Sequence, residues 1–485
     1  MFRKNLATGW ILAALALAPA AAPAQDAKAV LERATGAMGD PKSIRYAGEG
    51  TGWTFGQAFK PGMPWPKITV HSEIRTINYE TGSMRDEITL SRAEPKGGGG
   101  YPPVAQQRND QFVSGDYAWN QGPAGPQPGS RFVGDRVHQL WITPHGVIKA
   151  AMKNHATLKK PAQGGKGLTA VSFAEPGRFT ATAFINAEGL VERVESRLPD
   201  PVLGETTAVT LYSDYRDWGG VKFPSRIRQS QGGFPVLDLA VKEVQPNASA
   251  DIAPPDAVKN ATERVTTEKV AGGVWHVAGG SHNSVAIEMK DHIVLVEAPL
   301  NDGRSGAVFE EVKKLAPGKP IRYVINSHGH FDHSGGLRAA VAEGYTIITQ
   351  AGNKAYFERA FSTPDRIRPD RLAKSGKKPK LRTVNDKLVL SDGSRSIEIL
   401  HITGGDHNDS FLMAYLPKEK LLIEADAFTP GPPNSPPPEQ ANPNHLTLVA
   451  NLERLKLVPD KILPLHGRVA PLSDLYAAVK KPMPQ

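Results

Sequence analysis

Apolar and polar positions alternate along much of the first half of the chain. Within residues 68–74 and 84–90 the apolar side chains share one parity, as Ile68, Val70 and Ile74 do. Successive side chains of a strand point to opposite faces, so this period is that of a half-buried antiparallel strand. The pattern predicts an antiparallel β-rich domain that extends to about residue 247.

Shorter signals mark the ends of these strands. Residues 26–38 have apolar positions three or four apart and predict a short amphipathic helix. Residues 186–189 (NAEG) predict a hairpin turn between two strands. The Gly- and Pro-rich stretches 95–103 and 120–129 predict loops.

Beyond a stretch rich in Ala and Pro, residues 248–262, strands and helices alternate. The pattern predicts strands at 274–277, 285–289, 293–297 and 321–326, and helices at 306–315 and 336–342. Such alternation is typical of α/β layering. We therefore expect two domains of α+β and α/β class, a β-rich accessory domain at 25–247 and a second domain at 263–485, joined by a linker.

The first 24 residues have the layout of a secretory signal peptide. Arg3 and Lys4 form a basic head, residues 10–18 are an unbroken apolar run, and a small-x-small site precedes Gln25. We expect cleavage near Ala24 and a periplasmic or secreted protein. The apolar run is too short for a span, which needs about 20 residues, and no other stretch predicts a transmembrane segment.

Composition narrows the chemistry. The chain has no cysteine, which excludes disulfides, thiolate metal ligands and a cysteine nucleophile. The net charge is +9. This value permits an anionic substrate, but we expect no nucleic-acid partner because such a charge is common among exported proteins.

Three histidines and an aspartate fall within residues 328–333, directly after an apolar strand. On an extended segment His328 and His330 point to the same side. Where the chain turns into a helix, Asp332 and His333 can swing toward a second point beside the first. This geometry favours two adjacent divalent metals, which share a hydroxide when about 3.5–4 Å apart.

Three further candidates lie downstream, where apolar runs end: His407, Asp426 and His466. Strand ends are where α/β folds build their sites. We expect His282 and His445, in loops, to border the cleft and contact substrate. His401 is not expected to be a ligand, and the four histidines of the first half are expected to be solvated.

The order HxHxDH, a glycine-preceded His, an Asp after a strand and a late His-Gly resembles the metallo-β-lactamase superfamily. The resemblance implies an αββα sandwich holding two Zn²⁺ ions. It implies that His328, His330 and His407 bind one ion, that Asp332, His333 and His466 bind the other, and that Asp426 bridges them. The segments 215–224 and 240–247 resemble the periplasmic lipoprotein-carrier β domain, which implies a lipid or protein partner for the first domain.

The predicted function is that of a zinc hydrolase for a small-molecule substrate. A metal-bridging hydroxide, oriented by Asp332, attacks an ester, thioester, lactone or related bond. By the resemblance, Asp426 is typical of thioesterases, lactonases and phosphodiesterases, whereas Glu297 stands where Asp is common. An iron-dependent oxidoreductase on the same fold, a β-lactam hydrolase and a binding protein without catalysis remain as alternatives, because imidazole and carboxylate also bind iron.

Overall fold

The computed structural model describes residues 22–98, 106–159 and 167–484, with side chains from Ala27 onward. The first half forms one antiparallel sheet of 13 strands in the order β6-β5-β4-β3-β2-β1-β13-β12-β11-β10-β9-β8-β7. The strands are β1 Ser43–Trp53, β2 Lys67–Asn78, β3 Ser83–Arg92, β4 Gln107–Ser114, β5 Tyr117–Gly122, β6 Gly125–Pro128, β7 Thr157–Lys159, β8 Thr169–Glu175, β9 Phe179–Ile185, β10 Val191–Asp200, β11 Gly204–Asp217, β12 Lys222–Gln231 and β13 Phe234–Pro246.

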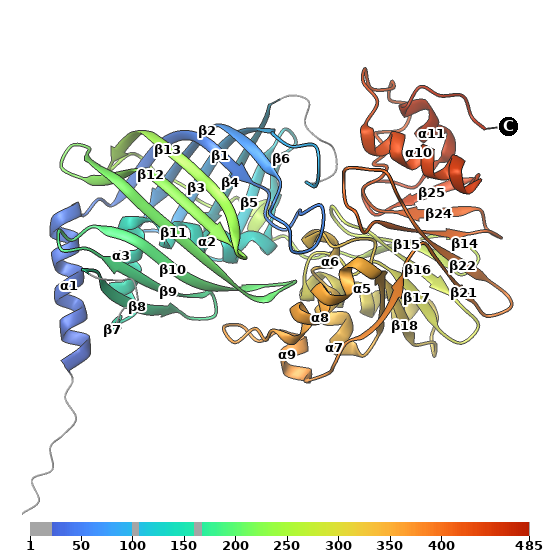
Figure 1. Ribbon diagram of the computed structural model, residues 1–485, viewed down its shortest axis with the longest axis horizontal. Helices are drawn as coiled ribbons and strands as arrows, with labels where there is room; N and C mark the ends of the chain where they lie inside the picture. The colour runs from blue at the N-terminus through green and yellow to red at the C-terminus, as the bar shows by residue number, and fades with distance from the viewer. Residues whose placement is uncertain (1–21, 99–105, 160–166, 485) are drawn as a thin grey trace, which may run out of the picture.

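The sheet curves around two helices, α2 (Val133–Trp141) and α3 (Pro144–Lys153), and α1 (Ala22–Met38) lies against it (Figure 1). Alternate apolar side chains of the strands meet the apolar faces of these helices in one core. The predicted antiparallel domain is therefore confirmed. The predicted hairpin is also confirmed, because β9 and β10 pair antiparallel around it.

Two expectations for this half are wrong. Residues 120–129, expected to be a loop, form the β5–β6 hairpin. Pro126 and Pro128 have no N–H to donate. They are tolerated because β6 is an edge strand, so no further strand on its outer side needs their hydrogen bonds. His138 and His145, expected to be solvated, are buried, and His138 Nε2 lies 2.7 Å from Ser196 Oγ.

The second half contains two sheets packed face to face. One has the order β14-β15-β16-β17-β18-β19-β20 and the other β21-β22-β23-β24-β25-β26. The strands are β14 Thr266–Ala271, β15 Val274–Ala278, β16 Ser284–Glu288, β17 Ile293–Val296, β18 Ile321–Ile325, β19 Thr346–Gln350, β20 Lys380–Val384, β21 Lys387–Ser391, β22 Ser396–His401, β23 Leu412–Leu416, β24 Leu421–Glu424, β25 Lys461–Pro464 and β26 Ala470–Pro471.

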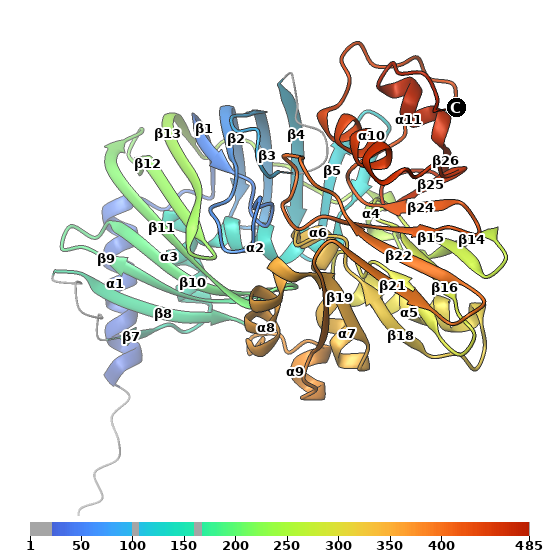
Figure 2. The ribbon, with the colours of Figure 1, turned by 45° about the vertical axis from the view of Figure 1, so that its right-hand side comes forward.

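Helices cover the outer face of each sheet (Figures 1 and 2). They are α5 Asp302–Leu315, α7 Leu337–Glu343, α8 Lys354–Ser362 and α9 Arg371–Ser375 on the first sheet, and α10 Pro443–Leu455 and α11 Leu472–Ala478 on the second. In β17, Val294 and Val296 pack between the sheets while Ile293 and Leu295 pack under the helices. Burial of both faces explains the unbroken apolar strands, and the expected αββα sandwich is confirmed.

The remaining expectations concern the ends of the domains. Residues 1–21 lie outside the described residues, and with them most of the expected signal peptide. The short helix α4 (Asp256–Lys259) lies within the expected linker. Among the described residues, no helix has both the length and the apolar character needed to cross a bilayer.

Candidate metal centre

Within each sheet, the strands that precede the candidate ligands run in one direction. β17 and β18 are parallel and β15 runs with them, because both β15 and β17 pair antiparallel with β16. In the second sheet β24 and β25 are parallel, and β22 runs with them, since both β22 and β24 pair antiparallel with β23. Strand ends of one direction meet at one edge, so these loops converge on one place.

A first cluster consists of His328, His330, His407 and Asp426, whose ligand atoms all lie within 4.8 Å of one another. All four residues are buried. Asp426 Oδ2 lies 2.9 Å from His407 Nε2 and 3.2 Å from His328 Nε2. His328 and His330 follow β18, His407 follows β22, and Asp426 follows β24.

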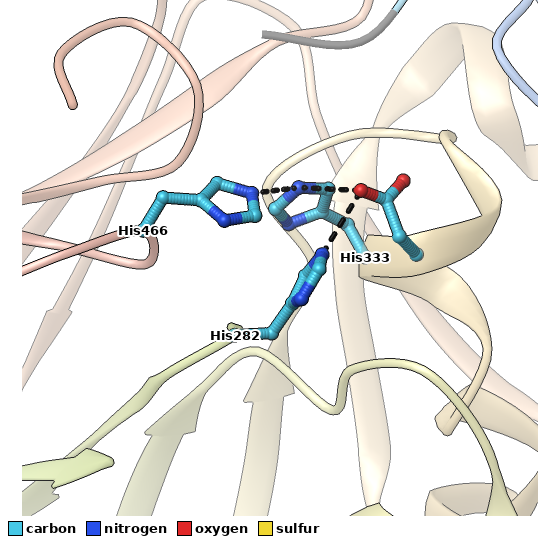
Figure 3. Close-up of side chains that lie close together, drawn as sticks. His282, His333 and His466 are labelled. Carbon is cyan, nitrogen blue, oxygen red and sulfur yellow. Dashed lines mark hydrogen bonds and ion pairs between the residues drawn. The ribbon is translucent and has the colours of Figure 1, made fainter. Parts of the chain in front are cut away.

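A second cluster consists of His282, Asp332, His333 and His466, again with ligand atoms within 4.8 Å of one another. The three histidines come from different segments of the chain and converge (Figure 3). His333 and Asp332 lie on the short helix α6 (Phe331–Ser334), which directly follows the extended residues of the first cluster. His282 Nε2 donates to Asp332 Oδ2 at 3.0 Å.

Asp426 joins the two clusters. Its Oδ1 lies 2.9 Å from His466 Nε2 and its Oδ2 lies 3.1 Å from His333 Nε2. One carboxylate therefore contacts two histidines of each cluster. The six residues expected around it, together with His282, lie in the two clusters, in the division that the order of ligands implied.

The chemistry of these donors fits bound metal ions. His328 Nε2 faces His407 Nε2 at 3.1 Å, and His333 Nε2 faces His466 Nε2 at 3.0 Å. Two donors held 2.0–2.1 Å from one tetrahedral ion are about 3.3 Å apart, close to these separations. The buried Nδ1 of His330 has no hydrogen-bond partner among the described residues, which leaves its lone pair for an ion.

Comparison with known proteins agrees with this geometry. Residues 277–468 match the family model described as the metallo-beta-lactamase superfamily. This part of the chain is a metallo-β-lactamase superfamily domain. The resemblance of the ligand order is thereby confirmed, while no comparison supports the expected lipoprotein-carrier likeness of the first half.

Solved structures and one curated relative are similar to this domain. A metallo-beta-lactamase from Pontibacter korlensis has 16% identity, covers 45% of this chain and 98% of its own, and has a TM-score of 0.35. A metallo beta lactamase from Hirschia baltica has 21% identity, covers 46% of this chain and 99% of its own, and has a TM-score of 0.34. The 2,4-dinitroanisole O-demethylase subunit alpha of Nocardioides sp. (strain JS1661) is 25% identical over 169 residues, which span 35% of this chain and 48% of that subunit.

A shell of hydrogen bonds orients the imidazoles of the metallo-β-lactamase domain. His466 Nδ1 donates to Ser281 O at 2.9 Å. Glu297, fully buried and at φ +74°, accepts from His333 Nδ1 at 3.0 Å and from Ser327 Oγ at 2.5 Å. These bonds place the ring proton on the outer nitrogen and direct Nε2 toward the centre. Glu297, which stands where the resemblance leads one to expect Asp, thus supports the His333 ring from behind.

Burial and opposite charges compete in this centre. Burial lowers the pKa of His328 to about 3 and, against the pull of Asp332, that of His282 to about 4. Burial also opposes the charge of His333, but Asp426 and Asp332 outweigh it and raise its pKa well above the usual range. Burial opposes the charge of Asp426 as well, but the imidazoles around it hold its pKa well below the usual range. These shifts keep the Asp426 carboxylate ionised and favour positive charge beside it.

Two expected substrate contacts fall in different places. His282 lies in the second cluster. The sequence around it did not indicate this position, except that His282 follows β15, which runs in the same direction as β17 and β18. His445 lies on α10, where it is buried with its ring 4.9 Å from that of Phe428. His401 is outside both clusters, and its Nε2 donates to Asp409 O at 2.8 Å.

A cavity of about 940 Å³ lies between the first domain and the metallo-β-lactamase domain and reaches Asp332. Residues 130–135 and 198–201 line it from the first half, and residues 300–303 line it from the second. Arg131 lines the cavity, and its guanidinium lies 4.5 Å from the centre of the Phe132 ring. Burial lowers the pKa of Arg131, whereas Asp332 opposes that shift. The cavity gives a polar small molecule a route to the second cluster.

Proposed function

We propose that the protein is an exported dinuclear zinc hydrolase that cleaves an ester, thioester, lactone or related bond in a small molecule. The observation that carries the proposal is Asp426, which lies 2.9–3.2 Å from four histidines divided between two clusters. A shared carboxylate between two imidazole groups suits a pair of divalent ions. Export rests on the pattern of the first 24 residues alone.

Zinc ions held by the two clusters would lower the pKa of bound water toward 7 and would polarise a substrate oxygen. Side chains of the protein orient the attacking water. Asp332 has one oxygen in the cluster and is partly exposed toward the cavity, so it can accept a proton from an attacking water. His282 holds that carboxylate in place through its Nε2–H.

The substrate enters, in this proposal, through the cavity between the two halves. The guanidinium of Arg131 and the carboxylates along the wall favour a polar molecule over a purely apolar one. The apolar rings of Phe55, Phe132 and Phe331 leave room for an aromatic or acyl group. A polar small molecule that carries an aromatic or acyl group and a cleavable ester therefore fits the lining best.

Iron-dependent oxidoreduction and β-lactam hydrolysis are the alternatives. Imidazole and carboxylate suit iron as well as zinc. A specific observation adds one further class of substrate, because the curated relative is by its name an O-demethylase of 2,4-dinitroanisole. An aryl methyl ether activated by nitro groups is thus a candidate substrate beside the esters.

Metal analysis followed by a substrate panel tests the proposal. We expect about two zinc ions per chain and hydrolysis within a panel of lactones, thioesters, carboxyl esters, phosphodiesters and the activated aryl ether. Iron with consumption of O₂ would favour the oxidoreductase instead. A chain that retains two zinc ions yet cleaves only β-lactams would overturn the proposed bond class.

A further inference from the structure

A segment of the first domain reaches the metal centre of the second. The β1–β2 loop (residues 54–66) leaves the 13-stranded sheet and lies against residues 329–332 and 408–409. Its backbone is held at both places, since Phe331 N donates to Gly56 O at 3.1 Å and Asp409 N donates to Phe59 O at 2.9 Å. The loop is therefore docked by main-chain bonds that do not depend on its side chains.

Aromatic packing fixes this contact further. The ring of Phe331, next to Asp332, lies 5.2 Å from that of Phe55 and 5.7 Å from that of Trp65, both edge to face. Gly56 has φ +80°, and a Cβ there would lie 2.6 Å from the Phe331 ring. Only glycine allows the loop to approach so closely.

From this position the loop contacts one ligand of the first cluster. His330 Nε2 donates to the carbonyl oxygen of Ala58 at 3.2 Å, and Asn408 Nδ2 donates to the same oxygen at 3.2 Å. The proton of the His330 ring is thereby held on Nε2, which makes Nδ1 the acceptor that faces the cluster. Metal-binding histidines are commonly oriented in this way by a carbonyl behind the ring.

The neighbouring residue contacts a ligand of the second cluster. Gln57, which is 9% exposed, donates from Nε2 to Asp332 Oδ1 at 2.8 Å. The opposite oxygen of Asp332 accepts from His282. The amide orientation of Gln57 is determined by this contact, because a flipped amide would set its oxygen against a carboxylate oxygen. The two bonds together fix the rotation of the Asp332 carboxylate.

We infer that the β1–β2 loop is part of the metal centre, with Gln57 as the positioning residue for Asp332 and the Ala58 carbonyl as the partner that sets the tautomer of His330. The first domain thereby acts on metal binding through two adjacent residues, one for each cluster. The inference rests on the proposed pair of metal ions but not on the bond that the enzyme cleaves.

The variant Gln57→Met tests the inference, because Met keeps the length of the side chain and removes its donor. Metal-free full-length protein is titrated with Co²⁺ and with Zn²⁺ against a chromophoric chelator. We expect the Kd of one of the two sites to rise about 10–100-fold, the usual effect of losing an outer partner, while the other site is unchanged. The matched control is Lys60→Met in the same loop, whose ion pair with Asp409 is about half exposed.

The outcomes separate this inference from the proposed function. If the natural chain binds two ions and Gln57→Met binds both with unchanged Kd, the positioning role is refuted and the hydrolase proposal stands. If both sites weaken equally and the metal-free variant melts at a lower temperature, Gln57 serves the fold and the inference is also refuted. If the natural chain binds no metal, both proposals fail.

Discussion

Replacing Glu297 by Gln measures how much of the metal affinity arises outside the ligands. The carboxylate is fully buried and accepts from His333 Nδ1 at 3.0 Å and from Ser327 Oγ at 2.5 Å. Gln keeps the shape of the side chain but loses the charge and turns one acceptor into a donor. Because both bonds reach Oε2, the Gln oxygen can take that place, but its amide nitrogen then faces the donors Asn326 Nδ2 and Ser327 N in place of Oε1. The His333 ring also loses its ionic partner, so Glu297→Gln weakens the support of this imidazole.

The magnitude follows from the support that the buried carboxylate gives to His333. Loss of an outer partner of a metal-bound imidazole costs about 10–100-fold in affinity. This is about 1.4–2.7 kcal/mol, since each tenfold change in a dissociation constant is about 1.4 kcal/mol. A hydrogen bond to a charged group is worth about 1.5–3 kcal/mol. Because the two ranges agree, we expect Glu297→Gln to weaken the second cluster by about 10–100-fold.

Competition with a chromophoric chelator gives the Kd of each site, and circular dichroism of the metal-free protein reports the fold. The matched control is Glu288→Gln, at the end of β16, where the carboxylate is partly exposed and pairs with Lys319. We expect the control to bind both ions normally. A folded Glu297→Gln chain with two unchanged affinities would refute the reasoning that this carboxylate orients His333.

Three further predictions address the centre, the contact between the domains and the pH dependence. Asp426→Ala should lose metal at both clusters by elemental analysis while His401→Ala keeps it, and two ions in the former would contradict a shared carboxylate. Gly56→Ala places a Cβ 2.6 Å from Phe331 at φ +80°, so urea unfolding should show a loss of about 1–3 kcal/mol; equal stability would exclude tight docking. Burial holds the pKa of His138 at about 3, below the ~6.5 of the unfolded chain, so the unfolded state binds more protons and stability falls as the pH drops from 6.5 toward 3. His138→Asn should lessen that fall, and parallel stability–pH curves would contradict it.

Local pattern was sufficient for the class of each half and for most of the candidate ligands. Alternation with period two predicts the antiparallel strands, and unbroken apolar runs predict strands covered on both faces. His407, Asp426 and His466 could be found because each follows such a run. Cysteine could be excluded as a ligand from composition alone.

Local pattern was insufficient where the neighbours of a residue decide its state. Residues 120–129 look like a loop, yet Pro126 and Pro128 are accommodated because β6 is an edge strand. His138 looks like a polar surface residue, yet it is buried with its ring 5.2 Å from that of Phe179. Neither the edge of a sheet nor the interior of a core is visible in the residues themselves.

The sequence by itself determined most of the side chains that could hold a metal ion, because ligand type, strand ends and glycine positions are local properties. Only the tertiary structure decided how those side chains are held. His282 joins the second cluster because β15 runs in the same direction as β17 and β18. Gln57 reaches Asp332 across 275 positions of the chain. Contacts over such separations depend on how two packed domains meet, and no periodicity of either segment records that arrangement.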